Sequence, residues 1–301
     1  MLTIKKYAAI DIGSNAVRLL ISNVIEQKGK PVVFKKNALV RVPVRLGADV
    51  FVKGRISKEN KQRLIDTMLA FRLLMKTHKV VRYKACATSA MRESKNGTEV
   101  VADILEHSGI SIDVIGGEEE AAIIAATDLN KFIDPNKVYL YVDVGGGSTE
   151  FSVIQNGEQI ASRSFKIGTV RLLNDMVLKE SWIDLQQWIQ DNTKQYHKIS
   201  VIGSGGNINK IFKESGKVIG RPLTYFYLST YFNTLQSYSY EERITELELN
   251  EDRADVIIPA MRIYLSAMKW SNAKHIYVPK IGLADGIIKS IYFNTVSSNT
   301  Q

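Results

Sequence analysis

The sequence predicts an α/β protein of two domains that share one plan, and two observations support this. First, residues 8–15 and 141–150 each combine an apolar strand, an Asp-x-Gly turn and a second strand-like run, so the chain looks duplicated. Second, 301 residues are more than one average domain needs. We therefore expect a first domain over residues 1–124 and a second over residues 125–301.

In the first domain, strands joined by short turns come before the helices. Ser57 is a plausible N-cap for a long helix in which Met68 and Met75 belong to the buried stripe. Residues 88–92 form a strand-to-helix junction. The expected strands are 7–12, 16–24, 31–42, 80–87 and 112–115, and the expected helices are 58–79, 100–107 and 121–132.

The second domain repeats the scheme and then becomes mainly helical. We expect the last helix, 283–293, to fold back onto the first domain. The expected strands are 138–144, 149–155, 158–165, 200–203 and 275–278, and the other expected helices are 169–176, 181–196, 208–213, 223–236, 240–246 and 251–270.

Composition limits the class of protein. The chain is 45% hydrophobic and 24% charged, as in ordinary soluble proteins. Its start leads directly into a strand, without a signal-peptide core or an apolar stretch near the roughly 18 residues that spanning requires. We therefore expect a cytoplasmic protein without a membrane partner. Because Cys86 is the only cysteine and the four histidines lack ligand spacing, an internal disulfide is excluded and zinc is not expected.

Positive charge is concentrated in the first half. Up to Ile124 the chain has 21 Lys and Arg against 13 Asp and Glu, whereas the remainder has 19 against 18. A basic half attracts polyanions, and nucleic acid, anionic lipid and polyphosphate all qualify; a solvated surface is the alternative. Few aromatic residues interrupt the basic segment 35–63, so recognition by base stacking gains little support.

Three successive glycines, 145 to 147, indicate a turn with unusual backbone angles or a close approach to another group. A phosphate oxygen is one such group, and a tight turn without a ligand is the alternative. Asp143 and Glu150 flank the turn and can both point into one mouth, where they repel each other unless a divalent cation or a proton lies between them. Mg²⁺ fits this pair best, although Glu150 could instead be an exposed strand carboxylate.

The matching turn in the first half offers a second group of polar residues. Arg18 shares a strand face with residues 16 and 20 and therefore faces inward or toward a cleft. Its guanidinium could clamp phosphoryl oxygens, and an ion pair across the hairpin is the alternative. The candidate residues here are Asp11, Gly13, Ser14, Asn15 and Arg18.

Three further segments are weaker candidates. Arg92 lies at a strand-to-helix junction where N–H groups favour anions, although a solvated arginine is commoner. Residues 203–207 form another glycine-rich turn, a common feature of such junctions. Acidic residues 118–120 suit the first turn of a helix. A hydrolase also needs a general base, and with no histidine near these loops we expect a Glu or Asp in that role.

Together these motifs resemble the exopolyphosphatase and guanosine pentaphosphate phosphatase family, within the actin, Hsp70 and sugar-kinase superfamily. The resemblance covers nearly the whole chain in the family's order. It rests on Asp11-Ile-Gly-Ser-Asn15 with Arg18, Thr88-x-Ala90-x-Arg92 with Asn96, Gly117-x-Glu119-Glu120-Ala121, Asp143-x-Gly145-Gly-Gly-Ser-Thr-Glu150, Gly203-Ser-Gly-Gly206, Arg253-Ala-Asp255 and Gly282-Leu283.

The resemblance implies two ribonuclease-H-like, actin-like ATPase domains, each a mixed sheet flanked by helices, with the active site in the interdomain cleft. It implies Mg²⁺-dependent hydrolysis of a terminal phosphoanhydride, with Glu120 as the catalytic base and Asp143 and Glu150 as metal ligands. The phosphate-binding residues that it implies are Asp11, Gly13, Ser14, Asn15, Arg18, Thr88, Arg92, Gly145, Gly146, Gly147, Ser148, Gly205 and Gly206.

The chain also departs from the family pattern. Longer members carry an added helical C-terminal domain, so this sequence resembles a short form. The resemblance therefore does not establish tight binding of long polyphosphate chains or their processive hydrolysis. Ala16 replaces a frequent family Ser, and Ala284-Asp285 stands where Arg-Glu is common. These departures concern local contacts more than the chemistry.

Three functions compete. The first is an exopolyphosphatase that shortens inorganic polyphosphate, the second a hydrolase of the 5′ γ-phosphate of guanosine pentaphosphate, and the third an actin- or Hsp70-like ATP-binding protein. Retention of Glu120, Asp143 and Glu150 favours a hydrolase. The expected partner is the polyphosphate or guanosine pentaphosphate substrate, without specific nucleic-acid binding. The sequence does not decide the oligomeric state, and a homodimer is kept as an alternative because related proteins are often dimers.

Overall fold

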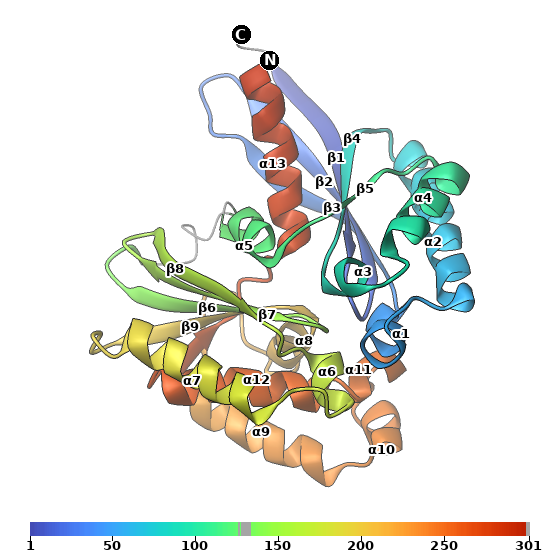
Figure 1. Cartoon of the computed structure of the whole chain (residues 1–301). Coiled ribbons are helices and arrows are strands. Elements are labelled where there is room, and N and C mark those ends of the chain that lie inside the picture. Colours follow the sequence, from blue (N-terminus) through green and yellow to red (C-terminus); the bar gives the residue numbers. More distant parts are fainter. Residues whose placement is uncertain (126, 128–133, 299–301) are drawn as a thin grey trace. The chain divides into compact units, whose positions relative to one another are not determined.

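The computed structural model describes residues 1–125, 127 and 134–298, which fall into two compact units. Unit 1 consists of Met1–Thr127 and Leu283–Gln301, and unit 2 consists of Asp128–Gly282. Each unit contains a mixed β-sheet flanked by helices (Figure 1). The sequence-based prediction of α/β units with mixed sheets is confirmed.

The strands of unit 1 are β1 (Leu2–Ile12), β2 (Val17–Gln27), β3 (Val33–Val42), β4 (Val80–Ala87) and β5 (Ile112–Val114). Within the described residues they form one sheet in the order β3-β2-β1-β4-β5. β1, β2 and β3 are antiparallel neighbours, whereas β4 runs parallel to β1 and β5 runs parallel to β4. The parallel strands end at the same edge of the sheet as β1, so the loops that follow them gather there.

The helices of unit 1 are α1 (Leu46–Lys53), α2 (Lys58–Thr77), α3 (Ser89–Glu93), α4 (Gly97–Ser108), α5 (Gly117–Ala125) and α13 (Leu283–Ser298). Ser57 caps α2 as predicted, because its side chain accepts a hydrogen bond from Asn60 N at 3.2 Å. Met68 and Met75 are buried in the core, also as predicted.

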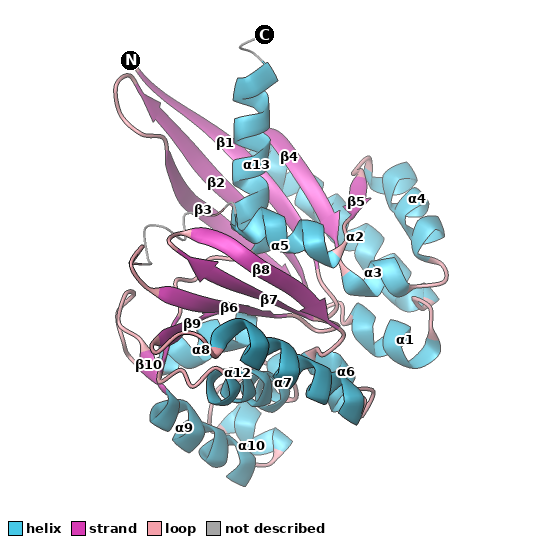
Figure 2. Cartoon of the chain, turned by 60° about the vertical axis from the view of Figure 1, so that its left-hand side comes forward, coloured by secondary structure: helices cyan, strands magenta, loops and turns pink. Residues whose placement is uncertain are grey.

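Helix α13 packs against the sheet of unit 1, as both views show (Figures 1 and 2). Tyr7 of β1 and Phe34 of β3 each meet the ring of Tyr292 edge-on, with centroids 6.3 and 5.6 Å apart. The Tyr292 hydroxyl donates to Glu26 Oε1 at 2.7 Å. Helix α13 thus belongs to unit 1, together with the first part of the chain.

Helix α1 was not predicted from the sequence. It follows Arg45, which adopts a left-handed backbone with φ 59°, and ends at Gly54, with φ 72°. Leu46, Val50 and Phe51 are buried at helical spacing. The basic character of the surrounding segment concealed this short amphipathic pattern.

Helix α5 was predicted over residues 121–132 but begins at Gly117. The Glu120 N–H donates to Gly116 O at 2.9 Å, so the three glutamates form the first helical turn. Carboxylates favour this position because they complement the helix dipole. Residues 126 and 128–132 of the predicted helix lie outside the described residues.

The strands of unit 2 are β6 (Val138–Val144), β7 (Thr149–Gln155), β8 (Glu158–Phe165), β9 (Ile199–Ser204), β10 (Leu223–Thr224) and β11 (His275–Tyr277). Among the described residues the sheet order is β10-β11-β9-β6-β7-β8. β6, β7 and β8 are antiparallel neighbours, and β9 runs parallel to β6. The first four strands of this unit thus pair as the first four strands of unit 1 do.

The helices of unit 2 are α6 (Thr169–Leu173), α7 (Lys179–Thr193), α8 (Gly206–Glu214), α9 (Tyr225–Ser237), α10 (Tyr240–Thr245), α11 (Glu251–Ala254) and α12 (Ile257–Trp270). The sequence predicted one helix over residues 251–270, but the structure divides it into α11 and α12. Pro259 explains the break, because proline lacks the N–H that a continuous helix would use and is tolerated only in a first turn.

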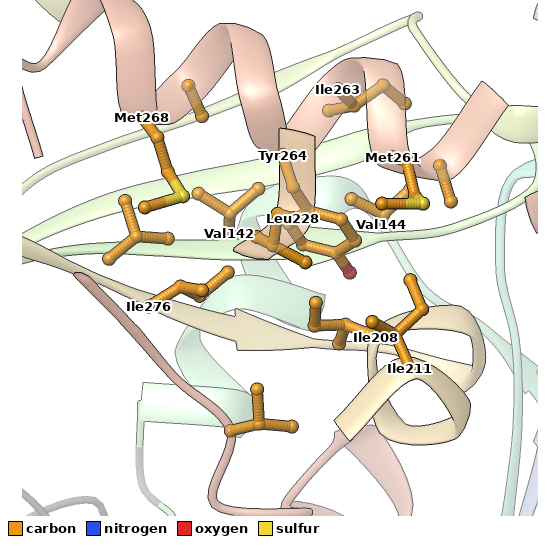
Figure 3. Close-up of a cluster of buried hydrophobic side chains, with 14 of the residues drawn as sticks. Val142, Val144, Ile208, Ile211, Leu228, Met261, Ile263, Tyr264, Met268 and Ile276 are labelled. Atoms are coloured by element: carbon orange, nitrogen blue, oxygen red, sulfur yellow. The ribbon is translucent and has the colours of Figure 1, made fainter. Parts of the chain in front are cut away.

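The core of unit 2 lies between its sheet and α12. Figure 3 shows Tyr264 of α12 among Val142 and Val144 of β6 and Leu228 of α9, all of them buried. Alternate residues of β6 face this core, so its remaining residues point to the opposite face of the sheet. Asp143 is one of these.

None of the described helices combines the length and apolarity needed to cross a bilayer.

Candidate active site

A row of four polar side chains crosses the sheet of unit 2. The strand registers pair Ser204 with Asp143, Asp143 with Glu150, and Glu150 with Ser164. Residues in register on neighbouring strands project to the same face, so these side chains are neighbours. The structure therefore brings the predicted carboxylate pair, Asp143 and Glu150, directly opposite each other.

Glu150 is held by hydroxyl groups. It is 2% exposed, and its Oε1 accepts hydrogen bonds from Ser148 Oγ at 2.7 Å and from Ser164 Oγ at 3.0 Å. The alternative of an exposed strand carboxylate is thus wrong. Two donors on one oxygen fix the orientation of the carboxylate, as outer-shell groups do for metal-binding carboxylates.

The triple-glycine turn between β6 and β7 is closed by a hydrogen bond from Gly145 N to Ser148 O at 3.0 Å. A Cβ on Gly168 would collide with the Gly146 carbonyl, so a second segment packs directly on the turn. In the described structure, the N–H groups of Gly146, Gly147 and Ser148 donate no hydrogen bond. Consecutive N–H groups of this kind form a concave site for an anion.

The turn at Gly205 and Gly206 lies beside Asp143. Gly205 has φ 114°, and a Cβ there would lie 2.9 Å from Val144 O and 3.5 Å from Asp143 Oδ1. Gly206 is the first residue of α8. Gly205 is therefore needed for a close backbone approach at this position.

Two buried tyrosines lie close to Asp143. Burial, and then the nearby Asp143 charge, raise the pKa values of Tyr141 and Tyr264 well above that of an ordinary tyrosine. The Tyr264 hydroxyl donates to Ser204 O. Both phenols therefore remain neutral at physiological pH.

Unit 1 carries a corresponding row across its own sheet. The registers align Arg41 with Arg18, Arg18 with Asp11, Asp11 with Cys86, and Cys86 with Asp113. Arg18 Nη1 lies 2.8 Å from Asp11 Oδ2. The ion pair across the hairpin is thus what the structure shows, and the Arg18 side chain remains 34% exposed.

The turn after β1 carries the predicted Gly13, Ser14 and Asn15. Gly13 N donates to Ala16 O at 3.1 Å, and Ser14 Oγ lies 2.9 Å from the Oγ of Ser89 at the start of α3. Ser14 is 3% exposed, so its hydroxyl is fixed within unit 1.

Helix α1 secures the same turn. Arg45 N donates to Asn15 O at 3.0 Å, and Gly47 N donates to Ser14 O at 2.7 Å. These contacts hold the turn from the segment that follows the third strand. Sequence reasoning missed them because it missed α1.

Thr88 and Arg92 flank α3. Thr88 is buried, and its N–H donates to Ile12 O at 3.1 Å, which joins the ends of β4 and β1. Arg92 Nη1 donates to Ile115 O at 2.6 Å. Arg92 thus ties α3 to the segment that enters α5.

Glu120 lies in the first turn of α5 in unit 1. It is half-buried, whereas Glu118 and Glu119 are exposed. A Cβ on Gly286 of α13 would collide with the Ile123 carbonyl, so the two helices cross at close range. This packing fixes the helix that carries Glu120.

The metal prediction rests on donor chemistry. Among the residues that the structure describes, no group of three or more His, Cys, Asp or Glu side chains is placed to hold a metal ion. Mg²⁺ is usually bound through one or two carboxylates, with waters and substrate phosphates as its other ligands. The facing carboxylates of Asp143 and Glu150 fit that requirement.

Ser204 lies in the predicted turn 203–207 but was given no role of its own, and four other residues of these sites were not predicted: Ser164, Tyr264, Arg41 and Arg171. A regular hairpin count from the pair of Gln155 and Glu158 would place Arg163, and not Ser164, opposite Glu150. The register shift between Val153 and Ile154 moves the pairing by one residue, however, and the sequence does not reveal it.

The Ppx/GppA phosphatase family matches residues 24–294 of the chain. The crystal structure of the Aquifex aeolicus member of that family superposes with a TM-score of 0.76 at 26% identity, covering 97% of this chain and 99% of that one. The two units are therefore ribonuclease-H-like, and the chain belongs to the Ppx/GppA phosphatase family.

The names of two similar proteins state the activities of those proteins. Exopolyphosphatase 2 of Mycobacterium tuberculosis is 33% identical over 176 residues, which are 57% of this chain and 54% of that protein. The guanosine-5′-triphosphate,3′-diphosphate pyrophosphatase of Photobacterium profundum is 33% identical over 167 residues, which are 56% of this chain and 32% of that protein. The aligned segments thus span about half or less of these relatives.

Proposed function

We propose that the protein is an exopolyphosphatase that uses Mg²⁺ to hydrolyse the terminal phosphoanhydride of inorganic polyphosphate. The observation that carries the proposal is the facing pair of carboxylates, Asp143 and Glu150. Next to them lies a turn in which three N–H groups donate no hydrogen bond to any described residue. Family membership supports the reaction class. The positive balance up to Ile124 supports a long polyanionic substrate.

The predicted residues take three roles in this proposal: metal ligand, general base and phosphate binding. Asp143 and Glu150 would hold Mg²⁺, which when bound would neutralise charge on the phosphoryl oxygens. Glu120 would be the general base. The phosphate chain would be bound by two arginines, by three turns and by two strand ends, through Asp11, Gly13, Ser14, Asn15, Arg18, Thr88, Arg92, Gly145, Gly146, Gly147, Ser148, Gly205 and Gly206.

The proposed reaction is an in-line displacement. Glu120 orients a water molecule and accepts its proton as the water oxygen bonds to the terminal phosphorus. The bond from that phosphorus to the bridging oxygen breaks, and the shortened chain leaves with the bond's electron pair. Arg18 and Arg92 stabilise the charge that spreads over the transferred group.

The second candidate function is hydrolysis of the 5′ γ-phosphate of guanosine pentaphosphate. It is favoured by the similarity to the Photobacterium profundum enzyme. The same residues would serve it, together with a nucleoside-binding site that neither the sequence nor the described residues identify.

Phosphate release tests the proposal directly. Long polyphosphate, tripolyphosphate, guanosine pentaphosphate and ATP would each be incubated with the protein in Mg²⁺ or in chelator. We expect Mg²⁺-dependent release from polyphosphate. Release from the pentaphosphate alone would favour the second function, and no release from any substrate would overturn both.

A further inference from the structure

The carbonyl groups of the triple-glycine turn all face one partner segment in unit 2. Thr169 N donates to Gly145 O at 3.0 Å, and Val170 N donates to Gly146 O at 2.9 Å. Both donors begin α6, which directly follows Gly168. Because the plane of a peptide carries its C=O and N–H on opposite sides, this anchoring directs the N–H groups of the turn away from α6.

The third carbonyl is held by a side chain. Arg171 Nε donates to Gly147 O at 2.7 Å, and Arg171 is only 8% exposed. A buried guanidinium donor makes a short, charge-assisted hydrogen bond with fixed geometry. The peptide that this bond orients joins Gly147 to Ser148, whose N–H is one of the three that donate to no described partner.

We propose that Arg171 is a positioning residue that sets the triple-glycine turn for phosphate binding. It acts through the Gly147–Ser148 peptide and does not itself touch the substrate. The same peptide leads to the Ser148 hydroxyl, which donates to Glu150. Arg171 therefore couples the anion-binding turn to the carboxylate that would hold the cation. This inference rests on the proposed function for the identity of the anion.

Two substitutions separate the Nε–H donor from the positive charge. In Arg171→Lys the charge is kept, but a methylene replaces the Nε–H group. In Arg171→Gln the charge is lost, but the Nε2–H group occupies the position of arginine Nε. Positioning through Gly147 O therefore predicts that glutamine substitutes better than lysine, whereas a simple need for positive charge predicts the reverse.

Amide NMR of the ligand-free protein gives the first readout. We expect the resonances of Gly147 and Ser148 to move in Arg171→Lys and to stay near their wild-type positions in Arg171→Gln. Equal movement in both variants, or movement in Arg171→Gln alone, would overturn the inference. This comparison needs no turnover, so it remains decisive if the proposed reaction is wrong.

Steady-state kinetics with inorganic tripolyphosphate and Mg²⁺ give the second readout. We expect Arg171→Lys to lower kcat/KM by about 100-fold, partly through a raised KM, because small displacements at a reacting group have effects of that order. Arg171→Gln should retain more of the wild-type kcat/KM and a near-normal KM. A lower kcat with unchanged KM in both variants would indicate partial unfolding and contradict a positioning role.

Arg163 is the matched control. It lies on β8 of the same unit but is exposed, and its guanidinium pairs with Asp184 at 2.9 and 2.6 Å. Arg163→Lys and Arg163→Gln should leave both readouts unchanged. Failure of the wild-type protein to release phosphate from any anhydride would overturn the proposed function, while the NMR comparison would still decide whether Arg171 orients the turn.

Discussion

The two units place different charges at equivalent positions of the same strand arrangement. In unit 1, Asp11 at the end of the central strand faces Arg18 and forms an ion pair with it. In unit 2, Asp143 holds the corresponding position and faces Glu150. The first aspartate is thus neutralised within its own sheet, whereas the second lies beside a like charge, which is unfavourable unless a cation or proton intervenes.

The difference shows how one scaffold can supply two kinds of site. In both units, the segment after the third strand anchors the turn between the first two, through α1 in unit 1 and α6 in unit 2. The backbone plan is therefore shared, and the side chains of the row decide the chemistry. In unit 1 the row pairs an aspartate with an arginine, whereas in unit 2 it places two carboxylates opposite each other.

Glu120→Gln should have the largest effect, because it preserves shape but removes the base. We expect kcat to fall by about 1,000-fold with little change in KM, given the usual contribution of general-base catalysis. Steady-state phosphate release would measure both constants. Glu118→Gln on the same helix is the control, and an undiminished rate in Glu120→Gln would exclude Glu120 as the base.

Asp143→Asn should have the next largest effect. Loss of one carboxylate from the facing pair should raise the Mg²⁺ concentration needed for half-maximal activity by about 100-fold. A Mg²⁺ titration of phosphate release measures the change. An unchanged Mg²⁺ requirement would show that the carboxylate row of unit 2 does not bind the cation.

Ser164→Ala should have a smaller effect in the same direction. It removes one of the two hydroxyl donors that orient Glu150, so we expect about a tenfold higher Mg²⁺ requirement. Ser162→Ala on the same strand face is the control, since Ser162 pairs with Ser152 and not with Glu150. An effect in the control as large as that in Ser164→Ala would point to a general change in β8.

Cys86→Ser should have the smallest effect on turnover. Cys86 is in register with Asp11 in unit 1, as Ser204 is with Asp143 in unit 2, so the substitution makes the two rows more alike. Burial raises the pKa of the Cys86 thiol to about 12. An unfolded cysteine ionises at about pH 8.5, so the neutral buried thiol stabilises the fold below that pH. This contribution declines as the pH rises toward about 12, by at most about 1.4 kcal/mol per pH unit.

Urea unfolding between pH 7.5 and 11 would test this prediction. The free energy of unfolding of the wild-type protein should fall more steeply with pH than that of Cys86→Ser, while turnover at pH 7.5 stays within about twofold because the residue has no proposed part in the chemistry. Identical pH dependences would show that the Cys86 thiol is not shielded from ionisation in the folded state.

Much of the fold and part of the site could be predicted from the sequence. The apolar strands before Asp11 and Asp143, and the seven-residue spacing of Asp143 and Glu150, sufficed to predict two similar units and a facing carboxylate pair. Short-range signals of this kind are the most reliable, because alternation and turn residues fix them locally.

Contacts that depend on tertiary packing could not be predicted. The partnership of Ser164 with Glu150 depends on a β-bulge, and that of Arg171 with Gly147 depends on how α6 packs on the turn. Helix α1 was missed because its apolar positions stand among charged residues. The roles assigned to Glu120 and to the phosphate-binding residues remain predictions.

The most direct test of the contrast between the rows is the effect of the same substitution in each unit on stability. Urea unfolding midpoints would be measured for wild type, Asp11→Asn and Asp143→Asn, with and without Mg²⁺. Asp11→Asn should destabilise the protein by about 1–2 kcal/mol, with or without Mg²⁺, because it leaves Arg18 without its charged partner. Asp143→Asn should instead stabilise the Mg²⁺-free protein by up to about 1 kcal/mol and abolish the stabilisation by Mg²⁺. Destabilisation of similar size by both substitutions, with Mg²⁺ stabilisation retained in Asp143→Asn, would contradict the account.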